Sequence, residues 1–90
     1  MVLDLDSAWE LHPQVSVRPE PFGALLYHFG TRRLSFLKDR TLLAVVESLA
    51  GSPTVREAFA SAGVSETDLP RYQSALDTLA KSSMVVERPS

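Results

Sequence analysis

The chain has no cysteine among its 90 residues, which excludes a disulfide framework, a thiolate metal site and a cysteine nucleophile. It also has no basic excess, because 9 Lys and Arg residues face 11 Asp and Glu residues and the net charge is −2. Proteins whose main partner is nucleic acid usually carry a basic face that neutralises phosphates, so this balance argues against nucleic acid. No apolar run is long enough to span a membrane.

Signals for secretion and for catalysis are equally sparse. The first residues are acidic and lack the basic segment of a secretion signal, so we expect a cytoplasmic protein. The two histidines, His12 and His28, do not stand at a ligand-like spacing from each other or from a carboxylate. No glycine-rich phosphate loop or nucleophile-elbow serine is found. The sequence therefore predicts a protein that is not an enzyme and has no metal or cofactor of its own.

The length predicts one small domain with a modest core. Residues 1–14 contain Trp9 but show no clear period, and Pro13 interrupts any helix there. We expect these residues to form an arm that packs loosely on a folded domain made by residues 15–90.

Residues 15–38 predict three short antiparallel strands. Gly30-Thr31 lies between two apolar runs and is typical of a two-residue hairpin turn, with glycine at the position that needs a positive φ. Such a turn pairs Tyr27 with Leu34 and Leu25 with Phe36. Alternation then gathers five large side chains on one face, which we predict to be the core face. They are Leu25, Tyr27, Phe29, Leu34 and Phe36.

The opposite face of the hairpin is mixed in character, since it carries Leu26, His28 and Leu37. Two interpretations stay open. The face is either a shelf for Trp9 of the arm or a docking surface for a larger partner enzyme. Leu26, His28 and Trp9 are the candidate residues for such a surface.

Three helices and a short strand follow. Asp39 is a candidate N-cap for the first helix, and Thr54-Val-Arg-Glu57 matches a capping box before the second. Pro70 marks the start of the third helix, and 84–87 predict a closing strand. The apolar stripe of the third helix is Leu69, Tyr72, Leu76 and Leu79. This order predicts an α+β fold: a winged helix-turn-helix with an N-terminal three-stranded antiparallel sheet, three helices and a short C-terminal wing strand.

The two outer strands of the predicted sheet differ at their edges. Pro19 and Pro21 remove backbone donors from the first strand, whereas the third strand contains no proline. An open edge of this kind is a hazard unless something pairs with it. Alternation from a two-residue turn directs the backbone groups of Arg33, Ser35 and Leu37 toward this edge. An added peptide strand, the protein's own arm and a second copy of the chain all stay open as its occupant.

With these residues in hand, the chain resembles the PqqD-like family of RiPP recognition elements, and within it the mycofactocin subfamily. The resemblance extends from Ala8 to Val86 and is most specific over residues 18–38. It implies a non-catalytic chaperone that binds the leader of a ribosomally made precursor peptide. The peptide would add as a strand between the third strand and the third helix. The chaperone would then deliver it to a radical S-adenosylmethionine maturase, which holds the iron–sulfur clusters and S-adenosylmethionine.

Carried over by position, the resemblance implies a peptide-binding site on this strand and helix. Its residues are Arg33, Leu34, Ser35, Phe36, Leu37, Lys38, Arg71, Tyr72, Ala75, Thr78 and Leu79. The partners are then the precursor peptide and the maturase, with no nucleic acid or membrane. One alternative is a winged-helix DNA-binding regulator, which the acidic residues at 66–68 disfavour. Another is self-association through the open edge, and we expect a monomer or a weak homodimer.

Overall fold

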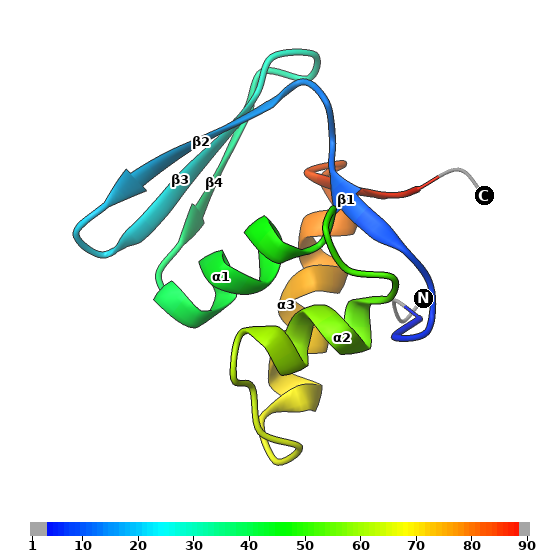
Figure 1. The fold of residues 1–90 in the computed structure, drawn as a ribbon. Helices are drawn as coiled ribbons and strands as arrows, with labels where there is room; N and C mark the ends of the chain where they lie inside the picture. Colours follow the sequence, from blue (N-terminus) through cyan, green and yellow to red (C-terminus); the bar gives the residue numbers. More distant parts are fainter. Residues whose placement is uncertain (1–3, 89–90) are drawn as a thin grey trace.

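The structure is a computed structural model and describes residues 4–88. The elements in chain order are β1 (Trp9–Leu11), β2 (Val15–Glu20), β3 (Gly23–His28), β4 (Arg33–Leu37), α1 (Arg40–Ser48), α2 (Val55–Ser61), α3 (Leu69–Lys81) and β5 (Val85–Glu87). They form one antiparallel sheet in the order β2–β3–β4 and a second sheet of β1 and β5. The helices gather at one end and on one side of the three-stranded sheet (Figure 1). The predicted α+β class is confirmed, but the sheets are divided into three and two strands.

The segment that was expected to be a loose arm is integrated in the fold. β1 pairs antiparallel with β5, with Trp9 opposite Glu87 and Leu11 opposite Val85. The closing strand is therefore paired and is not a free wing. Residues 1–3 and 89–90 of the two predicted segments lie outside the described residues.

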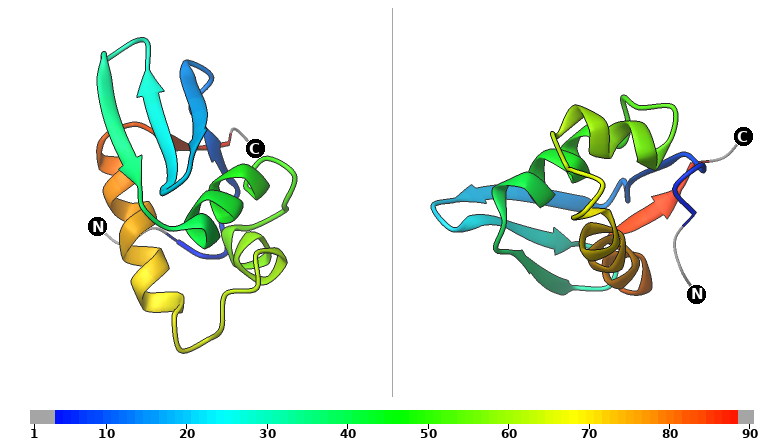
Figure 2. Two further views of the ribbon diagram at one scale, coloured as in Figure 1. Left: turned by 90° about the vertical axis from the view of Figure 1, so that its left-hand side faces the viewer. Right: turned by 90° about the horizontal axis from the view of Figure 1, so that it is seen from below.

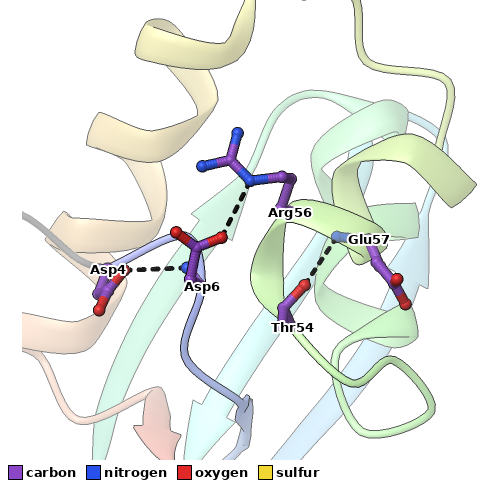
Figure 3. Close-up of polar contacts among 5 residues, drawn as sticks. All are labelled: Asp4, Asp6, Thr54, Arg56 and Glu57. Carbon is purple, nitrogen blue, oxygen red and sulfur yellow. Dashed lines mark hydrogen bonds and ion pairs between the residues drawn. The ribbon is translucent and has the colours of Figure 1, made fainter.

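The residues before β1 lie against the first turn of α2. The backbone N–H of Arg56 donates to the carbonyl oxygen of Leu5 at 2.8 Å. The Arg56 guanidinium also pairs with the Asp6 carboxylate at 3.1 Å (Figure 3). In the same region, Thr54 Oγ1 accepts a hydrogen bond from the N–H of Glu57 at 3.2 Å, which confirms Thr54 as the N-cap of α2. The N-terminal segment thus covers the start of α2 rather than the three-stranded sheet.

The register of the β3–β4 hairpin is as predicted, but its turn is different. Tyr27 lies opposite Leu34, and the last pair is His28 with Arg33. Four residues, 29–32, make the turn, and the N–H of Arg32 donates to the carbonyl oxygen of His28 at 2.7 Å. The positive φ belongs to Arg32, at 60°, so its assignment to Gly30 was wrong. A Cβ at position 30 would meet the end of the flexible Gln14 side chain and the His28 ring, so a larger residue there requires these side chains to shift.

The buried face of the hairpin is the opposite of the one predicted. Ala24 and Leu26 are completely buried, and Leu37 is 2% exposed. By contrast, Phe29 and Phe36 are each 61% exposed. A reversal at one position reverses the whole set, because side chains alternate strictly along a strand. Which face is buried depends on the side of the sheet against which α1 packs, and alternation within the hairpin carries no information on that.

The core lies between this buried face and the helices, and it leaves the other face of the sheet uncovered (Figure 2, right). The buried hydrophobic side chains are Ala24, Leu26, Leu37, Leu42, Val45, Val46, Leu49, Val55, Ala58, Phe59, Tyr72, Leu76, Leu79, Met84 and Val85. The α3 members, Tyr72, Leu76 and Leu79, belong to the predicted stripe. The fold therefore places α3 beside β4 with its apolar stripe turned inward.

Candidate functional site

β4 forms an open edge of the three-stranded sheet. It pairs with β3 on one side, and no strand within residues 4–88 pairs with its other side. The segment before β2 does not cover it, because β1 pairs with β5. Figure 2 (left) shows β4 at the margin of the sheet, on the side where α3 lies.

Two backbone hydrogen bonds fix which residues direct their polar groups toward the free edge. The N–H of Phe29 donates to the carbonyl oxygen of Gln14 at 2.9 Å, so Phe29 faces the β2 side. The carbonyl oxygen of His28 accepts from Arg32, so His28 faces β4. The direction of the backbone N–H and C=O groups alternates along a strand. The backbone groups of Leu26 and Ala24 therefore also point toward β4.

The residues of β4 opposite these positions therefore direct their backbone N–H and C=O groups toward β3. They are Arg33, Ser35 and Leu37, which lie opposite His28, Leu26 and Ala24. Leu34 and Phe36 direct their N–H and C=O groups toward the free edge. The prediction that Arg33, Ser35 and Leu37 turn outward was wrong, because a four-residue loop makes His28 and Arg33 the hydrogen-bonded closing pair.

A groove of about 330 Å³ lies between β4 and α3. It is lined by Leu34, Ser35, Phe36 and Leu37 of β4, Leu42 of α1, and Ala75, Thr78 and Leu79 of α3. Seven of these eight residues were predicted as site residues from the sequence. Leu42 was missed, because it lies on the apolar stripe of α1 and its spacing marks it only as a core residue.

The other four predicted site residues lie around this groove rather than in its lining. Arg33 and Lys38 are exposed at the two ends of the lining stretch of β4. Tyr72 is only 6% exposed, and its hydroxyl donates to Asp39 Oδ2 at 2.6 Å. Arg71 lies over the Tyr72 ring, 4.8 Å from the ring centroid, and donates to its hydroxyl at 3.1 Å. Tyr72 thus fastens α3 to the chain between β4 and α1.

Asp39 joins the strand, α1 and α3 at one end of the groove. Its Oδ1 accepts from the N–H of Thr41 at 2.7 Å and from the N–H of Leu42 at 3.3 Å, which confirms it as the N-cap of α1. The hydrogen bond from Tyr72 is the main cause that lowers the pKa of Asp39, although partial burial opposes it. The same bond raises the pKa of Tyr72. Asp39 is therefore held as a carboxylate and Tyr72 as a protonated donor.

The side chains of two predicted docking residues are not on the surface. Leu26 is completely buried and His28 is 3% exposed, because they belong to the core face. His28 Nδ1 accepts from the N–H groups of Gly30 and Thr31 at 3.0 and 3.1 Å, so this side chain supports the turn. Trp9 is half-buried and packs against the core. The docking surface cannot consist of Leu26 and His28, and this prediction is corrected.

Two negative findings apply to residues 4–88. No group of three or more potential ligands among His, Asp and Glu side chains is arranged to hold a metal ion. In the same part of the chain, no helix has both the length and the apolar content needed to cross a membrane.

An open strand edge beside an apolar groove is the geometry with which peptide-binding domains accept an extended partner. Comparison with known sequences identifies the family. Residues 8–86 match the Peptide chaperone MftB family, and the chain belongs to it. It is a family of chaperones and not of enzymes, so this protein is not an enzyme. The resemblance to this subfamily that was found in the sequence is confirmed.

Three relatives carry the name Peptide chaperone MftB. The Mycobacterium tuberculosis protein is 62% identical over 85 residues, which is 94% of this chain and 78% of the relative. The Mycobacterium ulcerans protein is 63% identical over 83 residues, covering 92% and 76%. The Mycolicibacterium smegmatis protein is 56% identical over 86 residues, covering 96% and 84%. No solved structure shows a significant match to this chain.

Proposed function

We propose that this protein binds the mycofactocin precursor peptide as an added β-strand on β4 and delivers it to a radical S-adenosylmethionine maturase. The observation that carries the proposal is the outer side of β4, which pairs with no strand of the described residues 4–88 and lies directly beside the groove against α3. The family supports a chaperone of peptides, as does the name that each of the three relatives carries. The helices and the β1–β5 ribbon would then form a winged-helix domain used for peptide binding.

Backbone pairing would contribute affinity for the peptide, and side-chain contacts in the groove would contribute selectivity. Leu34 and Phe36 offer N–H and C=O groups to an incoming strand, and each hydrogen bond contributes about 1 kcal/mol net. Backbone pairing is blind to sequence, so selectivity has to come from the groove. Its lining by Leu37, Leu42 and Leu79 favours apolar side chains at alternate positions of the peptide.

The strand-addition step is tested by titration calorimetry with the precursor peptide. Phe36→Pro removes an edge-facing N–H while leaving the inward bonds of Ser35 and Leu37 in place, as proline in an edge strand allows. We expect the peptide to bind the wild-type protein. Phe36→Pro should weaken binding by about tenfold or more, because the variant loses one hydrogen bond to the peptide and the proline ring hinders the neighbouring backbone contacts.

Phe36→Ala is the matched control, because it loses the same side chain but keeps the N–H. It should bind the peptide more tightly than Phe36→Pro does. Equal affinity of the two variants would refute strand addition at this edge. Delivery is tested separately, by co-purifying the maturase with the chaperone in the presence and absence of the peptide. No increase in maturase recovered with the peptide-loaded chaperone would refute delivery.

A further inference from the structure

Some lysine and arginine side chains of this protein form ion pairs, and others do not. Among residues 4–88, the ion pairs are Arg18 with Glu20, Arg56 with Asp6, and Lys81 with Asp77. Five exposed cations in the same part of the chain form none of these ion pairs. Arg40 donates instead to the carbonyl oxygen of Pro21 at 3.3 Å, and the other four are Arg32, Arg33, Lys38 and Arg71. These four cations are the ones that stand at the ends of the groove, on a protein whose net charge is −2.

Two of them mark one end of the groove and two mark the other. Arg32 and Arg33 lie at the turn where β4 begins. Lys38 follows the last residue of β4, and Arg71 is brought to the same end because its neighbour Tyr72 bonds to Asp39. Between the two ends, the lining contains no charged residue.

The carboxylates near these cations are already engaged. Asp39 accepts from Tyr72 and from two backbone N–H groups of α1. Asp68, one turn before Arg71, accepts from the Ser65 hydroxyl at 3.3 Å. Asp77 lies two positions from Ala75 and from Leu79, so helical spacing turns it away from the groove, and it pairs with Lys81 at 3.5 Å. Among residues 4–88, no carboxylate forms an ion pair with the groove-end cations, although the charge of the Asp39 carboxylate acts on Arg71 from nearby. Arg33 and Lys38 are therefore the cations most available to an acidic partner.

From this arrangement we infer that the groove selects a peptide with acidic residues on both sides of a short apolar stretch. The inference rests on the proposed function and deepens it by naming the class of peptide. Arg33 and Lys38 are five positions apart, so an extended partner would carry its acidic residues about 17 Å apart, which is about five residues. The apolar residues between them would contact the lining of the groove. Exposed charges contribute little to affinity singly, but they steer a partner and reject one of the wrong sign.

The test uses a display library of random twelve-residue peptides selected on the full chain. We expect acidic residues to be enriched on both sides of an apolar stretch among the selected peptides. The affinity of the consensus peptide should fall by about tenfold or more in the variant Arg33→Gln/Lys38→Gln/Arg71→Gln, and likewise in 0.5 M salt, because exposed charges are screened.

The matched control is Arg18→Gln/Arg56→Gln/Lys81→Gln, which also removes three positive charges but from ion pairs outside the groove. It should keep the wild-type affinity within about threefold. If the Arg71 change unfolds the protein, Arg33→Gln/Lys38→Gln replaces the triple variant. A consensus without acidic residues, or equal losses in the groove and control variants, would overturn the inference. A selected peptide that needs the Phe36 N–H but ignores the cations would overturn it and leave strand addition standing.

Discussion

The two faces of the β2–β3–β4 sheet differ in a way that runs against simple expectation. The face with the larger apolar side chains, including Phe29, Leu34 and Phe36, is the exposed one. The face with Ala24 and Leu26 is buried beneath the helices. The size of an apolar set therefore does not decide burial. A large exposed apolar face on a small protein is a feature that folding does not explain, and such faces are associated with binding.

The largest effect that separates the two faces is expected from a buried charge. Leu26→Asp places a carboxylate with no partner in the core, at a cost of several kcal/mol that a domain of this size cannot tolerate. We expect circular dichroism to show no cooperative thermal unfolding. Leu34→Asp, at a position that is 55% exposed, should remain folded. Cooperative unfolding of Leu26→Asp near the wild-type temperature would contradict the assignment of faces.

A smaller effect is expected at the next buried position of β3. His28→Phe keeps an aromatic ring but removes the acceptor for the N–H groups of Gly30 and Thr31. Urea unfolding should show a loss of about 1–3 kcal/mol. Tyr27→Phe, one residue away on the outer face, should change stability by less than about 0.5 kcal/mol. Equal losses of stability in His28→Phe and Tyr27→Phe would contradict the assignment of His28 to the buried face and Tyr27 to the outer face.

The contact between Tyr72 and Asp39 predicts a pH dependence. Because the folded state lowers the pKa of Asp39 below 3.8, this contribution is present above that pH and is lost as the pH falls through the lowered pKa. Because folding raises the pKa of Tyr72 above 10.0, the contribution of Tyr72 is lost as the pH rises through the raised value. Tyr72→Phe should cost about 1 kcal/mol at neutral pH and weaken both dependences. Urea unfolding across the pH range measures this, and unchanged acid and alkaline slopes would contradict it.

The smallest effect is expected on the outer face. Phe29 packs edge-on against Tyr27, with ring centroids 4.9 Å apart, but is otherwise largely in solvent. Phe29→Ser should therefore reduce the free energy of unfolding by less than about 1 kcal/mol. The control is Phe59→Ser, since Phe59 is 1% exposed and its truncation should cost about 3 kcal/mol or more. A loss at Phe29 comparable with that at Phe59 would show that the outer face is covered in solution.

Local signals in the sequence predicted the local structure well. The caps at Asp39 and Thr54, the order of elements from β2 to β5 and the hairpin register depend on contacts within a few residues, and all are observed. β1 was not predicted, because its partner β5 is distant in sequence. The buried face and the direction of the edge groups were predicted wrongly. The first depends on where α1 packs, and the second on a four-residue turn that resembles a two-residue one in sequence. The groove between β4 and α3 was anticipated through the family resemblance, whereas Leu42 depends on the packing of a third element.

The pairing of β1 with β5 has a consequence for how the chain is made. Trp9 and Glu87 lie opposite each other, although nearly the whole chain separates them. During synthesis, β1 leaves the ribosome long before β5 and cannot pair until β5 has been made. The β3–β4 hairpin and α1 need only neighbouring contacts and can form sooner. We therefore expect the β3–β4 hairpin to form first in the nascent protein and β1 to pair with β5 last.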